Sequence, residues 1–383
     1  MRIGIDLQCL PTRARELTGI SNYAYFLSKY LLRLDSPHKF VFFLPKESPY
    51  REELSRGGGE TVELPPKSVP FYSAHAVYSR IMNQARLDVL HAPANVLPMF
   101  YKRKAIITIH DLTIYHHPEW FPGGQWFSTK YSVPQSIKKA DKIIAPSQAT
   151  AKDLRELFKI PSSKINVIPH GVEERFFREE TRVRRQELGD SKGQLPTSNS
   201  YILFVGTLEP RKNLVRLVQA YSSLPKDIID DYDLVIAGTK GWAYEEILLE
   251  ISNLKLEIRG KVKLLNYVSE EKLPILYKCA SVFVYPSLYE GFGLPVLEAM
   301  AAGVPVVTSH QVASNMEYGI WNMGGGKALI SVDPYSTGDI AKAIVKLIRD
   351  SALASQLSSL AKDRARQFTW ENTARRTLGI YLA

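Results

Sequence analysis

Short runs of β-branched and aromatic residues alternate along this chain with longer stretches in which apolar residues recur every three or four positions. The short runs are typical of buried strands, and the longer ones of helices with one apolar face. This alternation favours parallel sheets covered by helices. The strands expected in the first half are 2–6, 39–44, 88–92, 105–111, 142–147 and 165–171. Helices are expected at 21–34 and 147–158, and Ser147 is a good N-cap for the second.

The pattern stops between residues 173 and 200, where a charged segment turns into a stretch of turn-forming residues without periodicity. A second set of strands is then expected at 201–207, 233–238, 261–268, 281–287 and 304–309. Three helices are expected after it, at 338–350, 355–368 and 370–383. The sequence therefore predicts an α/β protein of two doubly wound domains, 1–175 and 176–364, with a cleft between their loops.

The length and composition agree with two soluble domains. A chain of 383 residues is too long for one ordinary core. Its longest apolar runs, such as 40–44, fall well short of the roughly 18–20 residues that cross a bilayer. Residues 1–7 look like a first strand and lack the apolar core of a signal peptide. Cys9 and Cys279 stand far apart, so we expect no disulfide framework and a cytoplasmic protein.

Charge is unevenly distributed between the two halves. Residues 1–200 hold 29 Lys and Arg against 20 Asp and Glu, whereas residues 201–383 hold 20 against 19. A basic half can meet nucleic acid, an anionic membrane surface or an acidic substrate, or it can simply be a solvated surface. Because no nucleic-acid-binding motif accompanies the charge, we expect no nucleic-acid partner.

The stretch YEGFGLPVLEAMAAGVPVV (289–307) has the strongest chemical signature. A loop with Gly291 and Gly293 leads from an expected strand into an expected helix, where unpaired backbone N–H groups and the helix dipole suit a phosphate. Glu290 and Glu298 flank this loop, and carboxylates beside a diphosphate would be repelled by it. A carboxylate can instead accept hydrogen bonds from sugar hydroxyls. We therefore expect a divided site, with backbone for phosphates and acids for hydroxyls.

Four further positions are candidates from the residues alone. Arg211 and Lys212 follow an expected strand, where two cations could hold a diphosphate, although a solvated pair is the simpler alternative. His110 ends another expected strand, where a histidine is more often a packing or capping residue. Gly19 precedes the first long helix, where it could serve either a turn or a close approach of backbone to a ligand.

These segments together resemble the retaining glycosyltransferases of the GT-B fold, sequence family 4. EGFGLPVLEAMAAGVPVV resembles the E-x7-E motif of that family. The other matching segments occur in the expected order and cover nearly the whole chain: TGISNY (18–23), DVLHAP (88–93), ITIHDLTIYHHPEWF (107–121), IPHGV (168–172), FVGTLEPRKN (204–213) and NYVSEEKLPILYKCA (266–280). The resemblance also implies that the last helix, 365–383, completes the first domain.

The resemblance implies a hexose transfer from a nucleotide sugar, of the UDP-glucose or GDP-mannose type, to a hydroxyl of a glycan or lipid-linked glycan in polysaccharide biosynthesis. It implies a front-face displacement without a protein nucleophile, metal or other cofactor, and contact with an anionic membrane surface. The residues that it implies for catalysis are His110, Arg211, Lys212 and Glu290. The residues that it implies for donor binding are Gly19, Gly206, Thr207, Tyr267, Val268, Glu290, Gly291, Phe292, Gly293, Leu294 and Glu298.

Some features depart from the family, and some alternatives stay open. Thr207 stands where many relatives have an arginine, so Arg211 could take over that role. Residues 310–332 replace the usual serine-leucine-proline-glutamate turn. We interpret the pair Asp231 and Asp233 as a solvated strand start without a metal. A sugar-nucleotide 2-epimerase, a phosphorylase-like enzyme and a non-catalytic glycan-binding or partner-binding subunit are the alternative functions.

Overall fold

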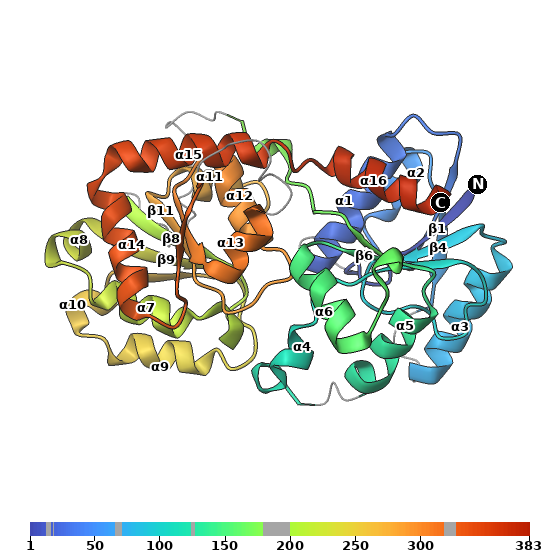
Figure 1. Cartoon of the computed structure of the whole chain (residues 1–383), viewed down its shortest axis with the longest axis horizontal. Helices are drawn as coiled ribbons and strands as arrows, with labels where there is room; N and C mark the ends of the chain where they lie inside the picture. The colour runs from blue at the N-terminus through green and yellow to red at the C-terminus, as the bar shows by residue number, and fades with distance from the viewer. Residues whose placement is uncertain (13–16, 18, 66–70, 124–126, 179–199, 318–326) are drawn as a thin grey trace. The chain divides into compact units, whose positions relative to one another are not determined.

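The protein folds into two compact α/β units (Figure 1). The computed structural model describes residues 1–12, 17, 19–65, 71–123, 127–178, 200–317 and 327–383. Unit 1 comprises Met1–Gly171 and Phe368–Ala383, and unit 2 comprises Val172–Gln367. The boundaries expected from the sequence were 175/176 and 364/365. In the part of the chain that is described, no helix is long and apolar enough to cross a membrane.

Unit 1 is built on a seven-stranded sheet in the order β3-β2-β1-β4-β5-β6-β7, and all neighbouring strands are parallel. The strands are β1 (Arg2–Asp6), β2 (Lys39–Pro45), β3 (Glu60–Leu64), β4 (Val89–Ala92), β5 (Ala105–Thr108), β6 (Lys142–Ala145) and β7 (Ile165–Val167). The helices are α1 (Gly19–Arg33), α2 (Arg51–Arg56), α3 (Phe71–Gln84), α4 (Thr113–His116), α5 (Val133–Lys139), α6 (Gln148–Phe158) and α16 (Trp370–Leu382).

Strand β2 explains why the first sheet reads as continuous apolar runs. Phe40 and Phe42 pack into the core that includes residues of α1 and α16, and Val41 and Phe43 pack into a second core on the opposite face. Both faces of a central strand are therefore buried, as in other parallel sheets. The six strands expected in this half are present, whereas β3 was missed because only one of its five residues is buried.

Unit 2 is built on a six-stranded parallel sheet in the order β10-β9-β8-β11-β12-β13. The strands are β8 (Ser200–Val205), β9 (Tyr232–Ala237), β10 (Val262–Leu265), β11 (Val282–Tyr285), β12 (Val306–Ser309) and β13 (Ile330–Val332). The helices are α7 (Leu214–Ser222), α8 (Lys226–Asp231), α9 (Glu245–Asn253), α10 (Leu256–Arg259), α11 (Leu273–Lys278), α12 (Leu294–Ala302), α13 (His310–Glu317), α14 (Thr337–Arg349) and α15 (Ser351–Ala365). The sequence missed only the three-residue edge strand β13 among these strands.

The expectation that Asp231 and Asp233 form a solvated strand start is wrong for Asp233. Its side chain is buried, and its carboxylate lies 3.9 Å from the Nζ atom of Lys261. Asp231 is exposed and ends α8. The short connection from α8 into β9 therefore places the two acids in different surroundings.

Each sheet has one place where the strand order reverses direction, and loops at the carboxyl ends of these strands form the usual ligand site of such folds. In unit 1 the reversal falls between β1 and β4, and in unit 2 between β8 and β11. The unit 2 loops at this place carry Arg211 and Lys212 after β8, and Glu290 after β11.

The C-terminal helix α16 packs against α1 and against the IPHG segment that ends unit 1 (Figure 1). The Thr373 hydroxyl donates to the carbonyl of Pro169 at 2.8 Å, and the Trp370 ring stacks on His170. A Cβ atom on Gly171 would lie 2.2 Å from the backbone nitrogen of Trp370. Glycine is therefore required where the chain leaves unit 1, because the first turn of α16 occupies the space of a side chain.

We predict that Gly171→Ala lowers the free energy of unfolding by about 1–3 kcal/mol, because the added methyl group must displace backbone. Chemical denaturation followed by tryptophan fluorescence measures this. Gly379→Ala, on α16 itself, is the matched control, because its Cβ meets no described atom within 4 Å. Alanine in a helix interior should there be neutral or stabilise by up to about 1 kcal/mol. Equal stabilities of the two variants would contradict this account of the IPHG segment.

Candidate functional site

The loops after β8 and β11 are tied together by hydrogen bonds to backbone atoms. The side-chain amide of Asn213 donates to the carbonyl of Pro286 at 3.0 Å. The Leu288 N–H donates to the carbonyl of Arg211 at 2.8 Å. Asn213 has φ 61°, a left-handed conformation that asparagine tolerates well. These hydrogen bonds therefore fix the two loops, and the side chains they carry, against each other.

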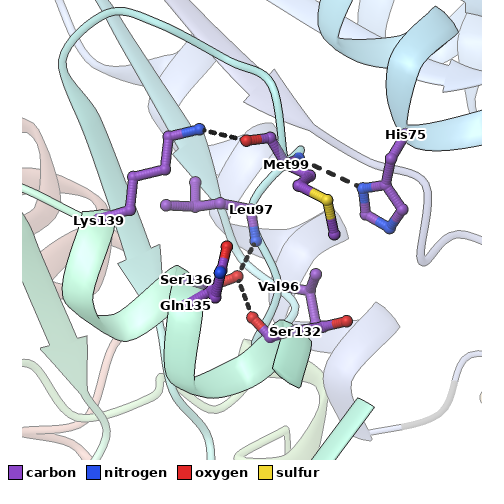
Figure 2. Close-up of a pocket in the computed structure, with 8 residues that line it drawn as sticks. All are labelled: His75, Val96, Leu97, Met99, Ser132, Gln135, Ser136 and Lys139. Atoms are coloured by element: carbon purple, nitrogen blue, oxygen red, sulfur yellow. Dashed lines mark hydrogen bonds between the residues drawn. The ribbon is translucent and has the colours of Figure 1, made fainter. Parts of the chain in front are cut away.

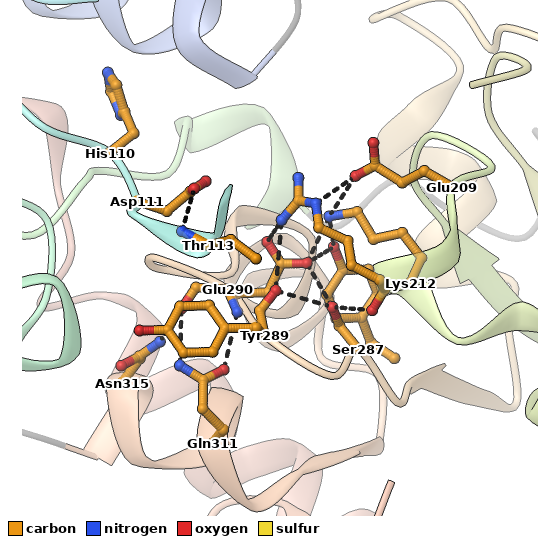
Figure 3. A network of polar contacts seen from close by, with 12 residues as sticks. His110, Asp111, Thr113, Glu209, Lys212, Ser287, Tyr289, Glu290, Gln311 and Asn315 are labelled. Atoms are coloured by element: carbon orange, nitrogen blue, oxygen red, sulfur yellow. Dashed lines mark hydrogen bonds and ion pairs between the residues drawn. The ribbon is translucent and has the colours of Figure 1, made fainter. Parts of the chain in front are cut away.

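The Glu290 carboxylate lies at the centre of the polar contacts between these two loops (Figure 3). Its Oε1 atom accepts hydrogen bonds from Lys212 Nζ at 2.5 Å, Ser287 Oγ at 2.7 Å and Tyr285 Oη at 2.9 Å. Its Oε2 atom accepts from Arg211 Nη1 at 2.9 Å. Burial alone would raise the pKa of Glu290, but the charges of Arg211 and Lys212 lower it to about 2. Glu290 is therefore ionised throughout the physiological range.

The sequence analysis assigned Arg211 and Lys212 to a diphosphate and Glu290 to sugar hydroxyls. The structure pairs these three side chains with each other. Lys212 is 6% exposed, and burial together with the neighbouring Arg211 lowers its pKa. Buried Glu209, which the sequence analysis did not single out, accepts a hydrogen bond from Arg211 Nε at 2.6 Å and lies 3.8 Å from Lys212 Nζ. The formal charges of the two cations and the two carboxylates thus sum to zero. The signal available in the sequence was the glutamate two positions before Arg211.

The loop then enters α12 through Gly293, which has φ 105° and favours glycine. Phe292 before it is buried, and Gly291 is buried as well. Among the described residues, the backbone N–H groups of Gly293 and Leu294 make no hydrogen bond. Since α12 also directs the positive end of its dipole at this point, the segment is suited to a phosphate.

The second acid of the motif has a different environment. Glu298, on α12, accepts a hydrogen bond from the hydroxyl of Tyr277 at 2.9 Å. Burial raises the pKa of Glu298 to about 7; the Tyr277 hydrogen bond and Arg175 oppose this rise, and the acids Glu173 and Glu270 add to it. Glu298 therefore changes its charge near neutral pH, whereas Glu290 does not.

The remaining unit 2 candidates lie in loops at the carboxyl ends of strands. Gly206 and Thr207 follow β8, and both are half-buried. Tyr267 and Val268 follow β10, with Tyr267 39% exposed. Arg211 lies beside Glu290, and its role in place of the arginine that Thr207 replaces stays a prediction.

His110 in unit 1 is fixed as a neutral imidazole. Its Nε2 atom lies 2.7 Å from the carbonyl oxygen of Pro93, which can only accept, so Nε2 carries the proton. Its backbone N–H donates to Asn95 Oδ1 at 2.8 Å. Burial lowers the pKa of His110, against the opposing effects of Pro93 and Asp111. The neighbouring Asp111 carboxylate accepts a hydrogen bond from the N–H of Thr113 at 3.2 Å, which is typical of a turn residue.

A buried polar chain supports the ring of His110. The hydroxyl of Tyr381 lies 2.6 Å from His91 Nδ1, and His91 Nε2 lies 2.8 Å from the hydroxyl of Thr108. That hydroxyl lies 3.0 Å from the hydroxyl of Tyr23, whose ring meets His110 edge-on at 4.9 Å. The chain joins α16, β4, β5 and α1, so the C-terminal helix helps to hold the histidine.

Gly19 is the first residue of α1, and its neighbour Thr18 lies outside the described residues. Gly19 is exposed, its φ is not positive, and a Cβ there would meet no described atom within 4 Å. The described structure thus gives no turn or packing reason for glycine at this position. The alternative that the sequence left open, an approach of backbone to a ligand, remains.

A small pocket lies elsewhere in unit 1, between the loop after β4 and the helices α3 and α5 (Figure 2). Ser136 Oγ accepts from the N–H of Leu97 at 2.9 Å, and Lys139 Nζ donates to the carbonyl of Met99 at 2.8 Å. None of the candidate residues lines it. In the described ranges, no group of three or more histidine, cysteine or acidic side chains is arranged to hold a metal ion.

Solved structures with the same fold cover almost the whole chain. HepE of Anabaena, in complex with UDP and glucose, has a TM-score of 0.77 and 17% sequence identity, over 99% of both chains. Sucrose-phosphate synthase of Thermosynechococcus elongatus has a TM-score of 0.76 and 20% identity, over 99% of this chain and 98% of that one. Together with the two parallel sheets, they show a GT-B fold of two Rossmann-like domains, as the sequence predicted.

Two sequence relatives align with 95% and 74% of this chain. The O-antigen chain mannosyltransferase B of Escherichia coli is 31% identical over 378 residues, which are 95% of this chain and 96% of that protein. The serotype-specific mannosyltransferase WbdA of Escherichia coli is 30% identical over 283 residues, but this alignment spans only 33% of that longer protein. The family model for Glycosyltransferase Family 4 matches residues 17–176, and that for Glycosyl transferases group 1 matches residues 186–364. The chain is thus a glycosyltransferase and belongs to the glycosyl transferases group 1 family.

Proposed function

We propose that the protein is a retaining mannosyltransferase of polysaccharide biosynthesis, which transfers mannose from GDP-mannose to a hydroxyl of a growing glycan. Mannose is favoured over glucose because the two relatives that align with 95% and 74% of this chain are mannosyltransferases. The observation that carries the proposal is the buried Glu290–Lys212–Arg211 cluster at the strand-order reversal of unit 2.

The diphosphate of the donor would bind at the start of α12. The N–H groups of Gly293 and Leu294 have no partner in the described structure, and the helix dipole favours an anion there. Lys212 Nζ makes two of the three hydrogen bonds that an ammonium can donate, so one N–H remains for a phosphate oxygen. Because Glu209 and Glu290 balance the two cations, the cluster would stabilise the leaving group mainly through directed N–H donors.

The donor sugar and the ribose would use the two acids of the motif. Glu290 Oε1 already accepts three hydrogen bonds, whereas Oε2 accepts one from Arg211. Oε2 is therefore the oxygen with capacity for a sugar hydroxyl. Glu298 beside Tyr277 would accept the ribose hydroxyls.

His110 would contact the transferred sugar as a hydrogen-bond acceptor. Since Nε2–H is directed at Pro93, the neutral ring has only Nδ1 to offer, and a sugar hydroxyl can donate to it. Displacement would take place on the face of the departing diphosphate, whose oxygen takes the proton of the acceptor hydroxyl. This route needs no carboxylate nucleophile and no metal, because the Arg211 and Lys212 donors and α12 hold the leaving group.

Unit 1 would meet an anionic membrane surface through residues near the end of α5. Phe100 is 47% exposed, and Lys102 and Arg103 beside it are exposed. Lys139 Nζ donates to the carbonyl of Met99, which places a further cation next to Phe100. An exposed aromatic ring among cations is typical of a surface that binds anionic lipid.

We predict that the purified protein transfers hexose from GDP-mannose in preference to UDP-glucose, and that the product, analysed by NMR, keeps the anomeric configuration of the donor.

Glu290→Gln should lower kcat/KM roughly a hundredfold, because it removes the charge that orders Arg211 and Lys212. Glu246→Gln, an exposed position on α9, is the control. Full transfer by folded Glu290→Gln would reject the assigned role. If the protein forms the epimer of the nucleotide sugar without any acceptor, it is a sugar-nucleotide 2-epimerase and the proposed function is wrong. If it binds no nucleotide sugar, a non-catalytic subunit is favoured.

We predict that the affinity for the donor depends on the charge of Glu298. Its pKa is raised to about 7, and the ionised form accepts two hydrogen bonds more readily than the protonated form. The donor KM should therefore fall roughly tenfold as the pH rises from about 6 to about 8. Glu298→Gln should flatten this profile, and a wild-type KM independent of pH would contradict the prediction.

We predict that the protein sediments with vesicles containing anionic phospholipid at low salt, and that about 0.5 M salt releases it because surface charges are then screened. The double variant Phe100→Ser, Lys102→Glu should remain in the supernatant. Leu249→Ser, at a position 62% exposed in unit 2, controls for loss of apolar surface. Sedimentation of the double variant at the wild-type level would reject this surface.

A further inference from the structure

Helix α13 (His310–Glu317) stands in the segment where the sequence departs from its family. It follows β12 directly, and its residues Gln311 and Asn315 are four positions apart, so they lie on the same face of the helix. Figure 3 shows both side chains directed at the loop that carries Glu290. Neither residue was a candidate from the sequence.

The two amides hold the backbone of Glu290 by three hydrogen bonds. The Glu290 N–H donates to Gln311 Oε1 at 2.9 Å, and Gln311 Nε2 donates back to the Glu290 carbonyl at 2.8 Å. Asn315 Nδ2 donates to the same carbonyl at 2.9 Å. Asn315 is 6% exposed and its hydrogen bond is buried, whereas the two bonds of Gln311 are partly buried. Only a side chain that offers a donor and an acceptor together can pair with both backbone groups of one residue, as Gln311 does.

The other contacts of α13 support the same loop. Val312 and Met316 are fully buried, and a Cβ atom on Gly293 would lie 2.9 Å from Val312 Cγ1 and 3.4 Å from Met316 Cε. The helix therefore contacts the loop at Glu290 and again at Gly293. The side chain of Glu290 is fixed from the opposite direction by Lys212 and its neighbours.

We propose that Gln311 and Asn315 are positioning residues for sugar transfer: they hold the Glu290 backbone so that its carboxylate meets the donor sugar and the Lys212 ammonium together. The assignment rests on the proposed function of this site. Neither amide touches the reacting atoms in this account, and both act through Glu290. The helix that replaces the family's turn thus supplies two hydrogen-bonding side chains to the donor loop.

The first test is Gln311→Glu, which keeps the length of the side chain and its acceptor but loses the N–H that faces the Glu290 carbonyl. A shift of the carboxylate by about 1 Å lowers turnover strongly, so kcat/KM for the donor should fall at least about tenfold. Inhibition by GDP and UDP should stay within about threefold of wild type, because the phosphate-binding amides of α12 are not changed. Asn315→Asp is the second variant, and His310→Ala, an exposed position on the same helix, is the control.

The pH profile separates positioning from a merely structural effect. A protonated glutamic acid again offers a donor and an acceptor, so the kcat/KM of Gln311→Glu, divided by that of wild type at the same pH, should rise as the pH falls from about 8 to about 5. Asn315→Asp should recover in the same direction. A uniform loss at every pH, or unchanged kcat/KM in both variants, would overturn the proposal.

Hydrogen exchange of residues 288–293 gives a readout that does not depend on activity. The Glu290 amide is bonded to Gln311, so Gln311→Ala should speed exchange of this segment roughly tenfold or more and leave the segment 200–205 of β8 unchanged. Unchanged exchange at 288–293 would overturn the proposal. If the wild-type protein transfers no hexose from any nucleotide sugar, the proposed function fails, and the exchange result still decides whether the amides order the loop.

Discussion

The buried contact between Lys212 and Glu290 organises the candidate site of unit 2. Two charges removed from water are tolerated only when each satisfies the other, and here the 2.5 Å contact is completed by Arg211, Ser287 and Tyr285. One partner follows β8 and the other follows β11, which are neighbours in the sheet but 78 residues apart in the chain. The strand order of the sheet is what brings them together.

From this contact the chain continues into two helices with different tasks. Helix α12 presents its positive end and the amides of Gly293 and Leu294, which have no hydrogen-bond partner among the described residues and suit a phosphate. Helix α13 holds the backbone of the same loop through Gln311 and Asn315. Side-chain contacts, backbone hydrogen bonds and a helix dipole therefore all act on one short loop. Without these supports the loop would not keep a single geometry.

The sequence predicted the central strands because both faces of a parallel sheet are buried, and such strands appear as continuous apolar runs. It missed β3 and β13, since edge strands are short or half-exposed and their pattern is weak. Within the site, Glu290 and Lys212 stood out because charges beside glycines and strands are unusual. Gln311 and Asn315 did not, because an amide that binds the backbone of a residue more than twenty positions away has no periodicity or spacing to reveal it.

In the proposed function, unit 2 contributes ionised side chains and unit 1 contributes a neutral one. Unit 2 holds the ionised groups, which a diphosphate and its departure require, and balances them among themselves so that each can be buried. Unit 1 contributes His110, which burial and the Pro93 carbonyl keep neutral. In the proposed function, a protonated His110 near a developing positive charge on the sugar would oppose the reaction, whereas a neutral acceptor would not. Under that proposal, the polar chain from Tyr381 to Tyr23 would serve the site as well as packing, since it helps to keep an uncharged histidine in one orientation.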